Sequence, residues 1–201
     1  MLQKGKTLAN CLRDTSGDGL RVIPEPMMDT IEQEGAASVD LRLGRWFSSL
    51  RQTRLASLSV EKSGNVSFPA DSYTLRYFIP FGQKFVLHPG TFVLGITLEW
   101  IRLPPGLGGY VLGKSSWGRR GVIIETAAGV HPGFSGCLTL ELSNAGEVAI
   151  EVIPGIKICQ LFLHATTAGP EKYKSSFDGR RRPVLGSIEP DEVVEKLSRP
   201  I

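Results

Sequence analysis

The sequence has 201 residues, enough for one domain with its own core, and its 41% hydrophobic and 21% charged residues exclude a disordered or fibrous chain. A net charge of +3 argues against wrapping a nucleic acid polymer, although the clusters Arg119-Arg120 and Arg180-Arg181-Arg182 could bind a small anion or stay solvated. No apolar run reaches the ~18 residues of a spanning helix, so we expect neither a nucleic acid polymer nor a membrane as a partner.

The first 35 residues or so predict an N-terminal arm. They contain a short helix pattern around residues 6–13 and a segment, VIPEPMMD, that two prolines interrupt. The arm lacks the apolar core of a signal peptide. The three cysteines are odd in number and widely spaced, with no CxxC pair. Together these features predict a reducing, cytoplasmic location.

A strand with one buried face follows the arm. The stretch ASVDLRLGRWF alternates Val39, Leu41 and Leu43 with polar residues, which is the period of two that such a strand requires. Two of the polar residues, Asp40 and Arg42, could have a functional role or form structural salt bridges. We favour the structural interpretation.

Strands dominate the middle of the chain. Residues 48–77 are polar and weakly periodic, which indicates loops with a strand or two at the periphery. The strand-like runs that follow are broken by Gly, Pro and Asn turn signals: KFVLHPG, TFVLGITLEWIRLP, GYVLGK, GVIIETA, CLTLELSN, VAIEVIPG and KICQLFLHA. Because no amphipathic helices separate them, we expect a mainly β sandwich, jelly roll or distorted barrel with short peripheral helices. One domain should span residues 1–201.

The C-terminal stretch, from about residue 166 to 201, has the composition of a tail. It is rich in Gly, Ser, Lys and Arg, and it ends in a segment, EPDEVVEKLSRP, that suggests a short helix. This composition suits either an idle tail or a lid that becomes ordered on a ligand.

The segment GKSSWGRRG has the residue types of a phosphate site. Lys114 and Arg119 supply positive charge, and Ser115 and Ser116 supply hydroxyl donors in a turn bounded by glycines. The Walker sequence GxxxxGK[ST] is absent. Composition alone leaves two interpretations open, a polyphosphate site and a polar surface turn.

Glu141 is the strongest single candidate for chemistry. In CLTLELSN, Leu138, Leu140 and Leu142 share one face of a predicted strand, and Glu141 lies on the other with Thr139. If that face lines a pocket, a partly desolvated carboxyl would have a raised pKa and could transfer protons. If it faces water, Glu141 is an ordinary surface residue.

Several motifs, in order and at fitting separations, resemble the dCTP deaminase family, which belongs with the trimeric dUTPases. They are GAASVDLRLG, VLHPGTFVLGITLEWIRLP, GKSSWGRRG, HPGFSGCLTLEL and PGIKICQLFL. The resemblance implies a distorted β-barrel or jelly-roll-like subunit in a homotrimer with active sites between chains. It also implies zinc-independent hydrolysis of dCTP to dUTP and ammonia, which supplies dUTP for thymidylate synthesis. Mg²⁺ would arrive on the nucleotide triphosphate, and the ligand signature of zinc deaminases is absent.

By matched position, the resemblance makes Glu141 the essential proton carrier. Ser115, with a backbone carbonyl of Ala127 or Ala128, would orient the attacking water, and Arg119 would stabilise the pyrimidine site. The other positions that it places at the nucleotide are Lys114 and Ser116 for the phosphates, Phe134 for the deoxyribose, and Trp117, Gly118, His131, Thr139, Gln160, Tyr173 and Arg180. Phe134 could instead be ordinary core packing, and Gln160 a buried structural amide.

The chain departs from the family pattern at two places. His131 stands where an aspartate commonly contacts the sugar and, in dUTPases and bifunctional members, assists diphosphate hydrolysis. Ser176 and Arg180 replace the usual lysine and glutamine of the lid, where Arg180 to Arg182 could rebuild the contacts. Two alternatives to a deaminase follow: a dUTPase or bifunctional enzyme that releases dUMP and diphosphate, and a non-catalytic nucleotide-binding homotrimer.

Overall fold

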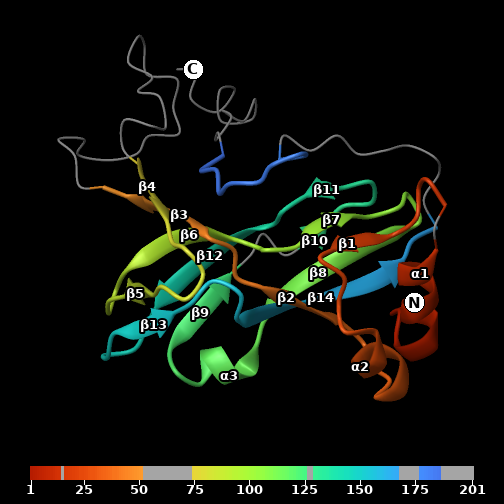
Figure 1. Cartoon of the computed structure of the whole chain (residues 1–201), viewed down its shortest axis with the longest axis horizontal. Helices are drawn as coiled ribbons and strands as arrows, with labels where there is room; N and C mark the ends of the chain where they lie inside the picture. Colours follow the sequence, from red (N-terminus) through yellow and green to blue (C-terminus); the bar gives the residue numbers. More distant parts are fainter. Residues whose placement is uncertain (15, 52–73, 126–128, 168–176, 187–201) are drawn as a thin grey trace, which may run out of the picture.

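The computed structural model describes residues 1–14, 16–51, 74–125, 129–167 and 177–186. The helices among them are α1 (Gly5–Arg13), α2 (Met28–Gln33) and α3 (Ser115–Gly118). The strands are β1 (Arg21–Ile23), β2 (Val39–Arg42), β3 (Trp46–Leu50), β4 (Thr74–Phe78), β5 (Phe85–Leu87), β6 (Phe92–Ile96), β7 (Trp100–Arg102), β8 (Leu107–Gly113), β9 (Val122–Glu125), β10 (Gly129–Val130), β11 (Ser135–Gly136), β12 (Thr139–Asn144), β13 (Ile150–Val152) and β14 (Lys157–Ala165). The mainly β fold with short peripheral helices is confirmed (Figure 1).

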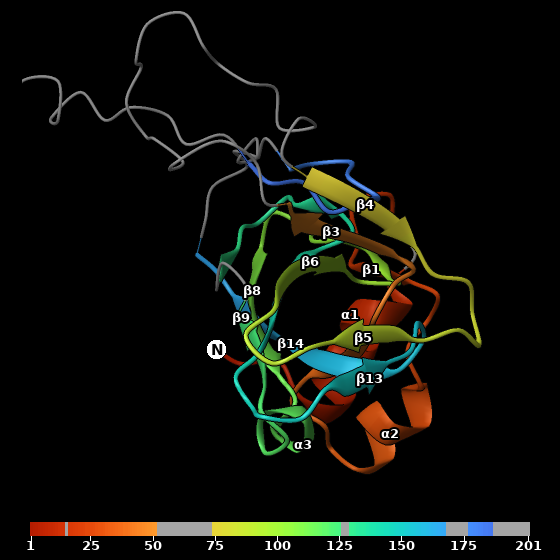
Figure 2. The ribbon, with the colours of Figure 1, turned by 90° about the vertical axis from the view of Figure 1, so that its left-hand side faces the viewer.

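The strands form antiparallel sheets that stay separate. Their orders are β4-β3-β6-β12-β9, β10-β8-β14-β2, β1-β7-β11 and β13-β5. In Figure 2, β4, β3 and β6 form one layer, and β5, β13 and β14 lie on the opposite side. Within the described residues no sheet closes on itself, so the expected barrel is an open one.

The N-terminal residues pack against the rest of the fold. The backbone amide of Gln3 donates to the carbonyl of Leu163 at 2.8 Å, which extends the β14 side of the fold. Leu8 and Ala9 of α1 are fully buried. Figure 1 shows α1 and α2 together at one end of the molecule. The helix expected around residues 6–13 is confirmed as α1. No described helix is long and apolar enough to cross a membrane.

Asn144 joins β12 to two neighbouring segments. Its side chain is 0% exposed, and its amide nitrogen donates to the carbonyls of Leu87 at 2.8 Å and Val148 at 2.9 Å. Its amide oxygen accepts a hydrogen bond from the backbone of Gly146 at 2.9 Å. Asn144 therefore fixes the end of β12 and the turn after it, where α3 also lies.

We expect Asn144→Ala to lower the free energy of unfolding by about 2–4 kcal/mol, because it leaves backbone groups at a buried position without partners. Urea unfolding at fixed protein concentration would measure the loss. Ser143→Ala, one residue earlier on the opposite face, is the matched control and should change stability little. A loss no larger than that of the control would contradict the role of this side chain.

Candidate active site

Glu141 lies in β12 on the face of the strand that points away from the core. Leu140 and Leu142 on either side are buried, whereas Thr139, Glu141 and Ser143 are half-buried. This alternation is the period of two of a strand with one core face. The prediction that Glu141 and these leucines occupy opposite faces is confirmed.

Two strands flank Glu141. In register, β6 places Leu94 opposite it and β9 places Glu125 opposite it. Burial, followed by the negative charge of Glu125, raises the pKa of Glu141 above its usual value. A carboxyl with a raised pKa can accept a proton and return it at a pH closer to neutral, which general acid-base catalysis requires.

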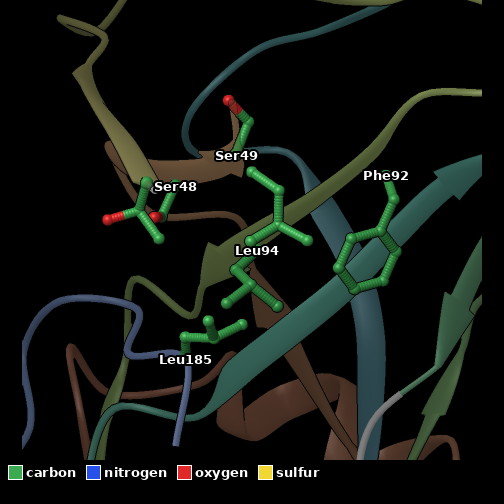
Figure 3. Close-up of a pocket in the computed structure, with 7 residues that line it drawn as sticks. Ser48, Ser49, Phe92, Leu94 and Leu185 are labelled. Atoms are coloured by element: carbon green, nitrogen blue, oxygen red, sulfur yellow. The ribbon is translucent and has the colours of Figure 1, made fainter. Parts of the chain in front are cut away.

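A small crevice occupies the same outer face of the five-stranded sheet (Figure 3). It is lined by Ser48, Ser49, Leu50, Thr74, Phe92, Leu94 and Leu185. Leu94, the cross-strand partner of Glu141, lies next to Leu185. Leu185, from the C-terminal segment, therefore packs beside the apolar neighbour of Glu141, Leu94.

Residues 177–186, the described part of the C-terminal stretch, pack against other segments of the same chain. The amide of Gly179 donates to the carbonyl of Ser135 at 2.6 Å, and the amide of Cys137 donates to the carbonyl of Arg180 at 2.8 Å. The Arg182 guanidinium lies 4.4 Å from the centroid of the Trp46 ring. Backbone pairing and a cation–π contact thus hold this segment beside β11 and β3. The predicted contact of Arg180 with a triphosphate stays a prediction.

Helix α3 and its C-cap residue, Arg119, carry candidate phosphate and water-orienting groups. Ser115, Ser116 and Arg119 are exposed. Trp117 is half-buried, and its indole nitrogen donates to the carbonyl of Lys157 at 3.0 Å. Gly118, the remaining candidate in the helix, is exposed as well. The helix therefore presents two hydroxyls and a guanidinium to the surroundings while its indole anchors it to β14.

The turn after α3 requires glycine at Gly121. Its φ is +90°, and a Cβ there would lie 2.9 Å from the backbone nitrogen of Gly146. The carbonyl of Gly121 also accepts a hydrogen bond from the amide of Ala145 at 2.9 Å. This close approach fixes α3 beside the turn that follows β12.

Lys114, expected at the phosphates, is ion-paired in this chain. Its Nζ donates to the Asp40 carboxylate at 2.6 Å, and Nζ of Lys157 lies 3.1 Å from the other oxygen of Asp40. Arg42 pairs instead with the buried Glu99 at 2.9 Å. The salt-bridging interpretation of Asp40 and Arg42 is thus confirmed, each with partners far away in the sequence.

Asp40 should make stability depend on pH. Burial on its own raises the pKa of Asp40, but the hydrogen bonds and charges of Lys114 and Lys157 outweigh it and lower the pKa. A carboxyl with a lowered pKa stabilises the fold above its unfolded pKa, and this contribution is lost as pH falls through the folded pKa.

We therefore expect Asp40→Asn to cost about 1–2 kcal/mol at pH 7 and to cost little at a pH below the folded pKa of Asp40. Urea unfolding of the two proteins at pH 7 and in acid measures the difference. Glu147→Gln, at an exposed position, is the control for loss of one negative charge. A cost that is equal at the two pH values would show that the lysine pairing is not its source.

Gln160 belongs to the Asp40 cluster. Its amide nitrogen donates to Asp40 and to the Ser38 hydroxyl, each at 3.2 Å. It also lines a cavity of about 230 Å³, together with residues of α2 and the segment before it and with Asp40 and Lys157. Within this chain Gln160 thus acts as a structural amide, and its predicted contact with nucleotide stays a prediction.

His131 and Phe134 lie in the loop before β11. His131 is exposed, whereas Phe134 is 7% exposed and packs in the hydrophobic core. The amide of Phe134 donates to the carbonyl of His131 at 3.1 Å, which shapes this turn. The packing of Phe134 fits the alternative of an ordinary core residue, and its predicted role at a deoxyribose stays untested. Ala127, Ala128 and Tyr173 lie outside the described residues.

β9 connects the turn after α3 to the neighbourhood of Glu141. Asn144 pairs with Val122, which follows that turn, and Glu141 pairs with Glu125 three positions further along β9. Thr139 lies beyond Glu141 on the same face of β12.

Glu125 is the residue near Glu141 that the sequence did not single out. The sequence pattern that could have identified Glu125 is the alternation in VIIE, which places Ile123 and Glu125 on one face of β9. The register that sets it opposite Glu141 is not visible in either segment alone. In the part of the chain that is described, no group of three or more His, Cys, Asp or Glu residues is placed to hold a metal ion.

Comparisons with known proteins confirm the resemblance to the dCTP deaminase family. Residues 7–166 match the family described as dCTP deaminase-like. The chain is 40% identical to the dCTP deaminase of Halorubrum lacusprofundi over 141 residues. The aligned region covers 70% of this chain and 68% of the relative. It is 39% identical over 170 residues to a protein of Mycolicibacterium smegmatis named dCTP deaminase, dUMP-forming, which covers 81% of this chain and 86% of the relative.

A solved structure shares the fold. The 2'-deoxycytidine 5'-triphosphate deaminase from Agrobacterium tumefaciens aligns with 82% of this chain at a TM-score of 0.60 and 22% identity. This chain spans 48% of the length of that protein. At this level of identity the likeness shows the common fold.

Proposed function

The chain belongs to the dCTP deaminase-like family, and from that premise we propose that it hydrolyses the 4-amino group of dCTP to give dUTP and ammonia. The observation that carries the proposal is the half-buried Glu141, whose pKa is raised on the outer face of β12. Its carboxylate would take a proton from a water molecule that attacks C4 of the cytosine. The same carboxyl would give that proton to N3, and it would then take the proton of the new C4 hydroxyl and give it to the departing amine, so that dCTP and water become dUTP and ammonia.

Helix α3 would supply the groups that orient the reactants. Ser115, with a carbonyl of Ala127 or Ala128, would hold the attacking water, and Arg119 would stabilise the pyrimidine site. Lys114 and Ser116 would bind phosphate, which requires Lys114 to exchange its partner Asp40 for the ligand. Mg²⁺ would bind through the phosphates, because it keeps several waters and favours phosphate oxygens.

The active site would form between copies of the chain in a homotrimer. An apolar surface on a central strand supports this arrangement: Tyr110 and Leu112 of β8 are 51% and 54% exposed, and the half-buried Phe162 of β14 lies opposite Tyr110. Apolar faces of this kind are normally covered by another subunit.

Release of dUMP is the second candidate, because the relative from Mycolicibacterium smegmatis is named as dUMP-forming. His131, in place of the expected aspartate, disfavours diphosphate hydrolysis here. Incubation of the protein with dCTP and Mg²⁺, followed by chromatography of the products, separates the candidates. The product dUTP supports deamination alone, and dUMP supports both reactions. No turnover on any of a panel of deoxynucleotides, with tight binding of one, would support a non-catalytic protein.

A further inference from the structure

Glu125 faces the same side of the sheet as Glu141. The two residues are direct partners in the antiparallel pairing of β9 and β12, and Ile123 and Ser143 form the next pair on that face. Direct partners in such a ladder point the same way and have Cβ atoms about 5 Å apart. The two carboxyl groups therefore share one patch of surface at the end of β9.

Among the described residues, the other sheet neighbours of Glu141 carry no charge. On the β6 side, Leu94 lies directly opposite and is 6% exposed, and Phe92 and Ile96 flank it. Along β12 the neighbours on this face are Thr139 and Ser143. From the C-terminal segment, Leu185 packs beside Leu94.

Other charged side chains lie further away on this face. Arg76 of β4 pairs with Ser48 of β3, which in turn pairs with Leu94 of β6, so Arg76 is three strands, or about 14 Å, from Glu141. Arg182 of the C-terminal segment lies over Trp46 on β3. Within the described residues, Glu125 is thus the charged group that directly faces Glu141.

We propose that Glu125 is a positioning residue for the proposed deamination, because its carboxylate keeps a proton on Glu141 at a pH at which an isolated glutamate would be ionised. This inference rests on the proposed function of Glu141. Like charges at cross-strand distance repel each other, so the charge of Glu125 disfavours the ionised form of Glu141. A carboxylate that holds a proton more tightly also accepts the proton of the attacking water more readily.

The electrostatics of the site agree with this geometry. Burial is the larger cause of the raised pKa of Glu141, and the charge of Glu125 adds to it in the same direction. Removal of the Glu125 charge should therefore lower the pKa of Glu141 while leaving the contribution of burial. The ionised, base form of Glu141 would then persist to lower pH.

The test compares Glu125→Gln with wild type in the full-length protein. Glu125→Asp keeps the charge and serves as the conservative variant, and Glu147→Gln removes one exposed charge elsewhere. The first readout is a ¹³C NMR titration of the side-chain carboxyl carbon of Glu141 without substrate, assigned by the loss of its signal in Glu141→Gln. The second is the pH profile of kcat/KM for ammonia release from dCTP.

We expect Glu125→Gln to shift the Glu141 midpoint, and with it the acidic limb of the profile, to lower pH. Glu125→Asp and Glu147→Gln should stay close to wild type. An unchanged midpoint in Glu125→Gln, or an equal shift in Glu147→Gln, would overturn the proposal. If wild type releases no ammonia, the proposed function fails, while the titration still shows whether Glu125 controls the ionisation of Glu141.

Discussion

Glu141→Gln is expected to lower the rate of ammonia release from dCTP by about 10²–10⁴-fold, the usual contribution of a general acid-base group. Glutamine has nearly the same size and can stay at the half-buried position in β12, but it cannot accept a proton from water. Nucleotide affinity should change little, because the residues proposed to bind the phosphates, Lys114 and Ser116, lie at the start of α3. Steady-state ammonia release and calorimetric titration with dUTP measure the two quantities.

Ser143→Ala is the matched control, since Ser143 is the next residue on the same face of β12. It should retain most of the wild-type activity. Undiminished turnover in Glu141→Gln would end the proposed mechanism. Equal losses of activity and of dUTP affinity would instead make Glu141 a binding residue.

Mixing two inactive variants should restore activity. Glu141→Gln lacks the proton carrier, and Arg119→Ala lacks the exposed guanidinium at the C-cap of α3. Suppose that each site takes Glu141 from one chain and Arg119 from its neighbour. In randomly mixed trimers, about a quarter of the sites between chains should then contain both intact side chains, because each of the two chains is the required variant about half of the time. Co-expression with two different tags, purification of hybrids and an ammonia assay measure the recovery.

The separate variants, and each variant mixed with itself, are the controls and should stay inactive. Native mass spectrometry establishes that hybrid trimers have formed. Hybrids that form without recovering activity would place both groups in a site within a single chain, which contradicts the proposed intersubunit arrangement.

Period-two alternation was sufficient to predict much of the sheet. It located β2 and β12, and it placed Glu141 on the face opposite the buried Leu140 and Leu142. It missed β10 and β11, because a strand of two residues has no period to detect. It also missed α2, whose six residues follow a proline-rich segment.

The candidate site was less predictable, because its contacts join distant parts of the chain. Lys114 lies in a segment with the residue types of a phosphate site. In this chain, however, its side chain pairs with Asp40, 74 residues earlier. Glu125 ends an apolar strand, and only the register with β12 sets it opposite Glu141. Local patterns specify which face a side chain takes, whereas tertiary pairing specifies what lies across from it.

The pairing of residues 177–186 with β11 also covers the outer edge of a sheet. β11 is the outermost strand of its sheet, and the carbonyl of Ser135 and the amide of Cys137 would otherwise be open to the backbone of another molecule. Unpaired outer strands are templates for aggregation, which proteins suppress by covering them. A chain shortened before Phe177 would therefore lose colloidal stability even if its catalytic groups were intact.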